Sequence, residues 1–212
     1  YPGIRSDSDM YTLGYSFKPW TDPKAIADGP AILEYVRETA RENGIDRKIR
    51  FHHRVKRASW SSADARWTVE AERGEEREIV RFTCGFLFMC SGYYRYEAGY
   101  EPEFPGSDRF AGRIVHPQKW SDDIDYADKR VVMLQRSPTY VVSRPSEDPI
   151  AHKLRRHLPA MLAYQIVRWK NVLRGMYVYR LCKRDPERIK RLIVGGVRME
   201  LGPDYDVAKH FT

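Results

Sequence analysis

The sequence is poor in cysteine and contains no long hydrophobic run. Its 212 residues include three cysteines, Cys84, Cys90 and Cys182, and no C-x-x-C pair. A set this sparse excludes a disulfide-rich secreted scaffold, disfavours a zinc site and suits a reducing compartment, so we expect a cytoplasmic protein without a bound metal. No apolar stretch reaches the length of about 18 residues that a membrane-spanning helix needs, so none is expected.

Several catalytic signatures are also absent. The chain lacks the G-x-S-x-G, H-E-x-x-H and G-x-x-x-x-G-K-[ST] motifs of common hydrolases and nucleotide-binding enzymes. His52 and His53 are neighbours in a predicted strand, where successive side chains point to opposite faces, so they cannot line one site together. We interpret both as surface residues. The first residues match neither an initiator Met nor a signal peptide, so we expect the sequence to begin inside a longer chain.

The charge is concentrated in one part of the chain. The whole sequence has 37 basic and 29 acidic residues, a net charge of +8, and 42% of its residues are hydrophobic. Residues 151–212 contain 14 Lys and Arg against 5 Asp and Glu, so residues 1–150 have a net charge of −1. A basic region of this kind is compatible with nucleic acid, an anionic membrane surface or a phosphorylated small molecule as the partner.

The first half of the chain reads as one helix followed by strands. Hydrophobic periodicity predicts a helix over 30–43 and a strand over 49–55. Alternation on either side of a Gly-containing turn predicts a hairpin with strands at 67–71 and 78–84. The apolar run at 86–90 is typical of a strand buried on both faces of a parallel sheet.

The second half contains one further apolar strand and then helices. A strand is predicted over 130–135, and helices are predicted over 151–157, 160–184 and 186–201. Within the longest helix we interpret one apolar stripe as core, formed by Ile166, Trp169, Leu173 and Tyr177. The predicted fold class is therefore α/β, a fragment of a parallel sheet followed by a basic helical region.

Three segments stand out chemically. The N-terminal loop contains Arg5, Ser6 and Asp7 among glycines and tyrosines, so it offers a guanidinium, a hydroxyl and a carboxylate close together. The segment 110–120 spaces Phe, Gly, His and Trp at intervals that fit neither helix nor strand, which indicates a shaped loop. In the third segment a predicted strand ends at Arg136 and Ser137. Nucleotides bind at that edge of α/β sheets, and the planar fork of an arginine matches the oxygens of an adenosine 2′-phosphate.

Together these segments resemble the class B flavoprotein monooxygenases of the Baeyer–Villiger type, closest to the ethionamide monooxygenase group. Phe110, Gly112, His116 and Trp120 match the family fingerprint F-x-G-x-x-x-H-x-x-x-W. Ser121 stands where the family usually has Pro or Asp. The segments YPGIRSD, RFHHRV, FMCSG and QRSP resemble further family segments, so the resemblance covers nearly the whole chain.

The resemblance implies a role for each matching residue. Asp7 is expected beside the flavin ring as the catalytic residue, where it helps to hold the active arginine. Arg5, Ser6 and Asp7 are expected to line the nicotinamide side, and Val55 to contact the FAD adenine through its backbone. Arg136 and Ser137 are expected to bind the 2′-phosphate of NADPH. The fingerprint residues His116 and Trp120 lie in an interdomain linker that couples cofactor position to the catalytic cycle.

The implied activity uses FAD, NADPH and O₂. Through a C4a-peroxyflavin, such an enzyme inserts one oxygen atom into a ketone or oxygenates the sulfur of a sulfide or thioamide. The resemblance divides the fold, a partial FAD- and NADPH-binding flavoprotein fold, into three parts. Residues 1–105 form a partial FAD-binding domain. Residues 106–147 hold the linker with the fingerprint and a partial NADPH-binding domain, and residues 148–212 form the basic helical region of that domain.

Several parts of the family pattern are missing. The FAD-binding G-x-G-x-x-G turn would precede Tyr1, the NADPH-binding turn is absent where residues 130–133 join two flanking segments, and the active arginine would follow Thr212. These 212 residues alone are therefore expected to be inactive. A non-catalytic relic of such an enzyme, and a basic helical module for nucleic acid or anionic lipid, stay open as alternatives. Peripheral membrane contact is a further open possibility, and the oligomeric state is not predicted.

Overall fold

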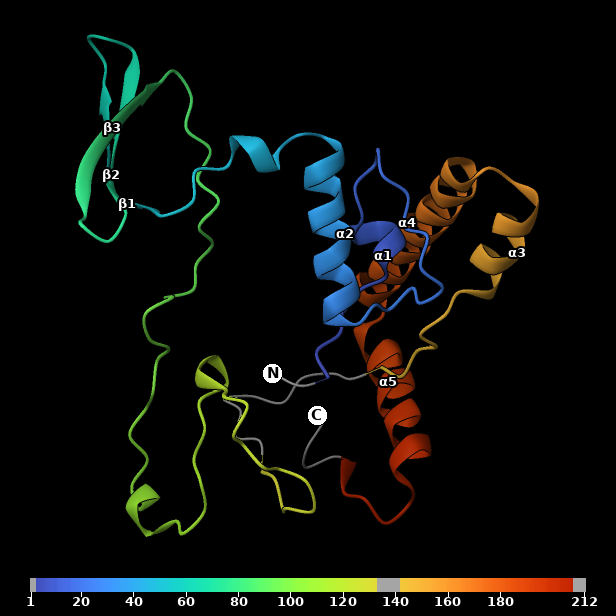
Figure 1. The fold of residues 1–212 in the computed structure, drawn as a ribbon. Coiled ribbons are helices and arrows are strands. Elements are labelled where there is room, and N and C mark those ends of the chain that lie inside the picture. The colour runs from blue at the N-terminus through green and yellow to red at the C-terminus, as the bar shows by residue number, and fades with distance from the viewer. Residues whose placement is uncertain (1–2, 133–141, 208–212) are drawn as a thin grey trace. The chain divides into compact units, whose positions relative to one another are not determined.

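The computed structural model describes residues 3–132 and 142–207 (Figure 1). It divides into two compact units, one formed by residues 1–39 with 123–212 and the other by residues 40–122. The two units are described separately. The first is helical, and the second contains the sheet and the loop with the fingerprint.

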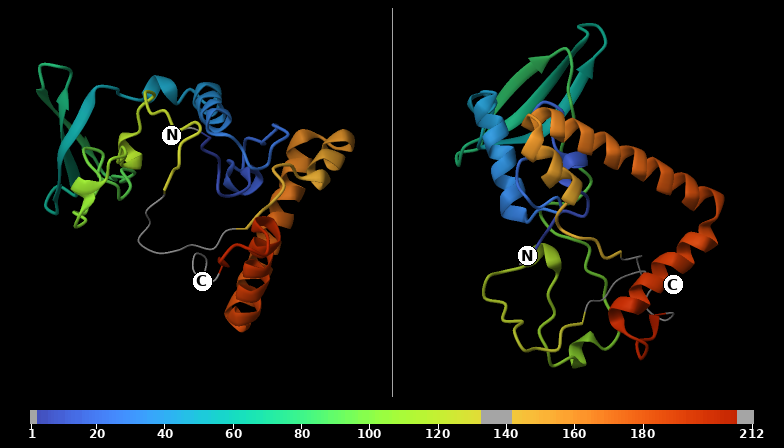
Figure 2. Two further views of the ribbon diagram at one scale, coloured as in Figure 1. Left: turned by 90° about the horizontal axis from the view of Figure 1, so that it is seen from below. Right: turned by 90° about the vertical axis from the view of Figure 1, so that its right-hand side faces the viewer.

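The helices of the first unit follow the sequence signals for helix ends. They are α1 (Met10–Leu13), α2 (Gly29–Glu42, whose last residues enter the second unit), α3 (Pro149–His157), α4 (Ala160–Arg184) and α5 (Pro186–Leu201). Asp148 caps α3 by accepting from the N–H groups of Ile150 and Ala151, and Asp185 caps α5 in the same way. Figure 2 shows α4 leading directly into α5. The four helices predicted over 30–43, 151–157, 160–184 and 186–201 are confirmed.

The core of the first unit is formed by α1, α2, α3, α4 and the segment that joins α1 to α2. Tyr11, Tyr164 and Val167 are almost completely buried there, with the alanines 25, 27 and 151 at points of close approach. Tyr35 on α2 accepts from the N–H of Tyr15 and donates to the carbonyl of Lys18. The Tyr35 hydroxyl therefore fixes the course of the loop after α1 while its own hydrogen bonds are satisfied.

Polar side chains of α4 hold α1, its capping residue Asp9 and the loop that follows α1. Arg168 Nη1 donates to the carbonyls of Tyr11 (3.0 Å) and Gly14 (2.7 Å). Three residues further along, Asn171 Nδ2 donates to Asp9 Oδ1 at 2.9 Å. Residues three apart lie on the same face of a helix, so this face of α4 is directed at the loop. The guanidinium of Arg168 is thus occupied by hydrogen bonds within the first unit.

The apolar stripe predicted on α4 is not the buried one. Trp169, Leu173 and Tyr177 are 60%, 59% and 64% exposed, whereas Tyr164 and Val167 are buried. Apolar residues surround this helix on all sides, so periodicity alone could not select the inner face. The polar contacts of Arg168 and its neighbours with the loop select it. The interpretation of the stripe as core is wrong.

The second unit contains one antiparallel sheet of three strands in sequence order. Its strands are β1 (His53–Ser61), β2 (Arg66–Arg73) and β3 (Glu78–Cys84) (Figure 1). Val69 and Ala71 of β2 are buried. At the turn from β2 to β3, Gly74 and Arg77 have φ values of +66° and +55°, which this tight connection requires. The predicted hairpin of 67–71 and 78–84 is confirmed.

The strand predicted over 49–55 begins later than expected. Asp46–Lys48 form a 3₁₀ helix, and β1 starts at His53, which is paired with Arg73 at the end of β2. Since the chain turns after Arg73, the pairing before His53 is limited to one hydrogen bond, from the Gly74 N–H to the His52 carbonyl (2.9 Å). His52 lies in a turn with φ of +56° and is not part of the strand. The prediction that both histidines lie in one strand is therefore wrong.

The run at 86–90 is also not a strand here. Phe86, Phe88 and Met89 are 78%, 77% and 70% exposed, and residues 130–132 are equally outside regular structure. A strand buried on both faces needs parallel neighbours and covering helices. Among the described residues the only sheet is the antiparallel one, so the predicted parallel sheet is not found there. Residues 133–135 of the other predicted strand lie outside the described part.

Asp148 links α3 to α4 and should make the stability of the first unit depend on pH. Its carboxylate lies 2.5 Å from Lys170 Nζ. Burial raises the pKa of Asp148, but the hydrogen bonds from Lys170 and from the backbone of Ala151 and Ile150 outweigh this effect and hold the pKa below its ordinary value. Its contribution to stability is therefore complete above the ordinary Asp pKa and is lost as the pH falls through the folded-state pKa.

Replacing Asp148 with Asn should lower the free energy of unfolding by about 1–2 kcal/mol at neutral pH, because the charged hydrogen bond to Lys170 is lost. Chemical denaturation at a series of pH values measures this. The difference from the unsubstituted chain should shrink as the pH falls below about 4. Asp204→Asn, at an exposed position, is the matched control. A difference that stays constant with pH would show that the ion pair contributes nothing.

Candidate functional site

The N-terminal loop, residues 3–9, is held against residues 25–29 by backbone hydrogen bonds. Ser6 N–H donates to the Ala27 carbonyl (2.9 Å), and Gly29 N–H donates to the Ile4 carbonyl (2.9 Å). Met10 N–H donates to the Ala25 carbonyl at 2.8 Å. The loop thus lies like a short strand beside the segment that enters α2, and Arg5 and Asp28 form an isolated antiparallel bridge.

The three predicted residues of this loop differ in their availability. Ser6 Oγ accepts from the N–H of Ala27 at 2.9 Å, so its hydroxyl helps to fix the loop. Asp7 is exposed, and its carboxylate has no hydrogen-bond or ion-pair partner among the described residues. The structure therefore brings Arg5, Ser6 and Asp7 together in one fixed loop and leaves the Asp7 carboxylate open to solvent.

A residue that sequence reasoning missed, Asp28, holds the side chain of Arg5. Asp28 Oδ1 lies 3.0 Å from Arg5 Nε, and Asp28 Oδ2 lies 2.5 Å from Lys24 Nζ. The Lys24 hydrogen bond lowers the pKa of Asp28 most, and the charges of Lys24 and Arg5 add to this against a smaller effect of desolvation. Asp28 thus engages Arg5 at Nε, and within residues 3–132 and 142–207 no other side-chain partner of this guanidinium is found.

The sequence contains a signal that places Asp28 at the start of a helix. An Asp followed by Gly29 and Pro30 is typical of the start of a helix. In the structure the Asp28 carbonyl accepts from the N–H groups of Ala31 and Ile32 in the first turn of α2. Its partnership with Arg5 could not be read from spacing, because it depends on residues 5 and 28 lying side by side.

Val55 lies on β1 in the second unit. It is opposite Ala71 and 60% exposed, and the register of β1 against β2 shifts between Val55 and Arg57. Such an irregularity leaves backbone groups outside the regular ladder. This is compatible with the predicted contact through the Val55 backbone.

The fingerprint residues lie in one loop of the second unit, residues 110–120, which we call the fingerprint loop. His116 precedes the 3₁₀ helix Pro117–Lys119, and its ring Nδ1 accepts from the N–H of Gln118 at 3.2 Å. Gly112 lies against the ring of Phe110, where a Cβ would come within 2.6 Å of two ring carbons. Trp120 follows the helix and is half-buried. The shaped loop predicted from the spacing is confirmed.

The remaining predicted site residues, Arg136 and Ser137, lie outside the described residues, so the structure does not place them.

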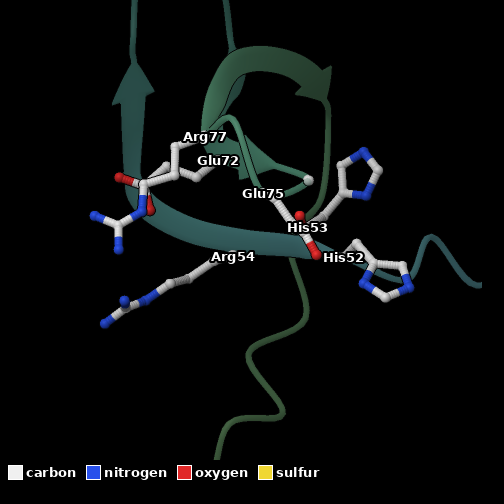
Figure 3. A pocket seen from close by; sticks show the side chains of 7 residues that line it. His52, His53, Arg54, Glu72, Glu75 and Arg77 are labelled. Carbon is white, nitrogen blue, oxygen red and sulfur yellow. The ribbon is translucent and has the colours of Figure 1, made fainter.

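A hollow of about 370 Å³ in the second unit is lined by His52, His53, Arg54, Glu72, Gly74, Glu75 and Arg77 (Figure 3). The two imidazoles point to one side and the two guanidinium groups to the other. Arg54 is paired with Glu97 at 2.5 Å. Opposite charges are mixed and already partly paired, so the hollow favours neither an anion nor a cation.

The described residues contain neither a cluster of metal ligands nor a helix suited to a membrane. No three His, Cys, Asp or Glu side chains of this part of the chain are grouped so that they could hold a metal ion. None of its helices combines the length and the apolar character that crossing a membrane requires.

Comparison with known proteins finds a family and close relatives. Residues 15–141 match the family described as "FMO-like: Flavin-binding monooxygenase-like". The chain is 50% identical over 235 positions to the FAD-containing monooxygenase EthA of Mycobacterium tuberculosis, and 47% identical over 236 positions to EthA of Mycolicibacterium smegmatis. These matches cover all of this chain and 48% and 47% of the two relatives, so the chain spans about half their length.

A solved structure is also similar. An oxidized steroid monooxygenase bound to NADP is 33% identical, with a TM-score of 0.45 over 59% of this chain and 24% of that one. The first relative aligns over 235 positions against 212 residues here, a difference of 23.

The link between Asp28 and its two cations predicts a titration pattern. Carbon-detected NMR should give Asp28 a pKa below the ordinary value of about 3.9. Lys24→Met should raise that pKa toward the ordinary value, and Arg5→Met should raise it less, because the Lys24 hydrogen bond is the largest cause of the shift. The control Arg37→Met, at an exposed position of α2, should change nothing. A larger effect from Arg5→Met would contradict this arrangement.

Proposed function

Because the chain belongs to the flavin-binding monooxygenase-like family, we propose that it is part of an FAD- and NADPH-dependent monooxygenase. The observation that supports this most is the 50% identity, over the whole chain, to a protein named as an FAD-containing monooxygenase. The chain has a partial fold of this family, with a small sheet and C-terminal helices. The proposed reaction transfers one oxygen atom of O₂ to a ketone or to the sulfur of a sulfide or thioamide.

The residues present fit the ring ends of the two cofactors. Asp7 offers an unpaired carboxylate and Arg5 offers two guanidinium nitrogens, which suits the carboxamide and charge of a nicotinamide ring. Ser6 fixes the backbone between them. Val55 offers its backbone to the FAD adenine, and Arg136 with Ser137 is the proposed site for the 2′-phosphate.

The pyrophosphate groups of the cofactors have no matching site in these residues. The sequence contains no G-x-G-x-x-G turn. Its one pair of adjacent glycines, Gly195 and Gly196, lies within α5 and cannot open a helix toward a phosphate. We therefore derive no chemical step from these 212 residues alone. When bound in the longer protein, flavin supplies the activated oxygen and NADPH supplies the reducing equivalents.

The proposed domain division follows from the same family pattern. Residues 1–105 belong to the FAD-binding domain and residues 106–147 to the linker and NADPH-binding domain. Residues 148–212 form the helical region of the latter. Some basic side chains of that region already have partners within the first unit. Arg155 and Arg168 donate to backbone carbonyls, and Lys170 donates to Asp148. We therefore propose no nucleic-acid function for it.

A second candidate is a non-catalytic relic of such an enzyme. It is favoured by the direct join of the two flanking segments at residues 130–133, where the family pattern has a unit with a glycine-rich turn. The genomic sequence around the codons for residues 130–133 separates the two candidates. An intact glycine-rich turn there supports the enzyme.

The function is tested on the longest protein that contains this chain. Purified with added FAD, it should be yellow and should consume NADPH and O₂ with a ketone or a thioether. Asp7→Ala should lose oxygenation by at least about a hundredfold, since removing a group beside the reacting centre typically costs this much, while the FAD content stays unchanged. A colourless protein that leaves NADPH unconsumed would overturn the proposal, and full activity of Asp7→Ala would remove the role of that residue.

The proposed binding of the 2′-phosphate by Arg136 predicts that replacing this residue weakens the use of NADPH more than that of NADH. Arg136→Ala should raise the KM for NADPH about tenfold or more, because a charged hydrogen bond to phosphate is worth about 1.5–3 kcal/mol. The KM for NADH, which has no 2′-phosphate, should change by less than about twofold on the same reasoning. Steady-state kinetics with both coenzymes measures this. An equal loss with both would show that Arg136 does not bind the 2′-phosphate.

A further inference from the structure

Gly99 lies directly against the ring of the fingerprint histidine. A Cβ on Gly99 would lie 2.5 Å from His116 Nε2 and 2.9 Å from Gln118 Oε1, and it would also collide with His116 Cε1. Cβ atoms essentially never approach other heavy atoms within 3.0 Å. Gly99 is not among the glycines with positive φ, so its backbone angles do not demand glycine. The space taken by the imidazole does.

The imidazole cannot move aside freely, because it is part of the turn that follows it. His116 Nδ1 accepts from the N–H of Gln118, and the His116 carbonyl accepts from the N–H of Lys119 at 2.8 Å. An accepting Nδ1 requires the tautomer with hydrogen on Nε2, the atom that faces Gly99. Displacing the ring would leave the N–H of Gln118 without this partner.

The segment around Gly99 is tied to the same turn on both sides. Gln118 Nε2 donates to the carbonyl of Arg95 at 2.5 Å, and Lys119 Nζ lies 2.9 Å from Glu101 Oε1. The hydrogen bond and the charge of Lys119 hold the pKa of Glu101 below its ordinary value. We call residues 95–101 the fingerprint seat. It contacts His116, Gln118 and Lys119, and Gly99 lies between its two polar ties.

We propose that Gly99 is a positioning residue for His116, and that the fingerprint seat fixes the orientation of the imidazole by offering a surface without a side chain. The contact itself is independent of the proposed function. Its consequence for turnover rests on that function, since the fingerprint loop is expected to couple cofactor position to the oxygenation cycle. Gly99 then acts through His116 and touches neither substrate nor cofactor.

The contact is tested first on the 212-residue chain by NMR with ¹³C-labelled histidine. We expect a nuclear Overhauser effect between the Gly99 Hα protons and the His116 Hε1 proton. Gly99→Ala should abolish it and shift the His116 Cε1–Hε1 signal. Gly85→Ala is the matched control, because a Cβ at Gly85 meets nothing within 4 Å and its φ is not positive. An unmoved His116 signal in Gly99→Ala, or the same shift in Gly85→Ala, would overturn the proposal.

A rescue variant separates positioning from general destabilisation. Gly99→Ala should lower the midpoint of chemical denaturation of this chain, whereas the same change added to His116→Ala should lower it much less, because the collision is gone. Equal losses in both backgrounds would show that Gly99 does not act through His116. This measurement needs no cofactor.

The consequence for turnover is tested on the longer enzyme with FAD bound. Gly99→Ala should increase, about fivefold or more, the fraction of NADPH oxidised without oxygenated product, an effect that a shift of about 1 kcal/mol in positioning accounts for. FAD content and the Gly85→Ala control should stay unchanged. Normal coupling in Gly99→Ala would overturn the positioning role. If the unsubstituted protein shows no turnover, the proposed function fails, and the NMR measurements decide the inference on Gly99.

Discussion

Side-chain donors on one face of α4 hold α1, its capping residue Asp9 and the loop that follows α1, and the geometry of the first unit depends on these contacts. Gln165, Arg168 and Asn171 each reach a carbonyl or carboxylate between residues 9 and 16. Buried carbonyls left without donors are costly, so these hydrogen bonds define one position for the loop. The preceding residues, with Arg5 and Asp7, are fixed in turn through their pairing with residues 25–29.

This arrangement also explains the basic character of the helical region. Within Ala160–Arg184 there is no acidic residue, yet Arg168 and Lys170 already have partners in the loop and in Asp148. Net charge therefore overstates the free positive surface. On the same helix Trp169 and Tyr177 are 60% and 64% exposed.

In the second unit, two glycines allow the backbone to pack closely against aromatic rings. The fingerprint loop lies on residues 95–101, and it can do so because Gly99 has no side chain in the space of the His116 ring. The same principle applies within the loop, where Gly112 admits the ring of Phe110. Gly99 and Gly112 thus leave room for aromatic rings to pack against the backbone. The packing of the fingerprint loop therefore also depends on Gly99, which lies outside the fingerprint.

The sequence by itself determined the helices, the hairpin, the fingerprint loop and the family. Helix caps, proline at first turns and alternation are local signals, so Asp148 and Pro186 mark helix starts wherever the helices lie. The buried face of α4, the start of β1 at His53, the hold of Asp28 on Arg5 and the contact of Gly99 with His116 were decided only by the tertiary structure. Each depends on residues distant in sequence lying side by side, which no local pattern encodes.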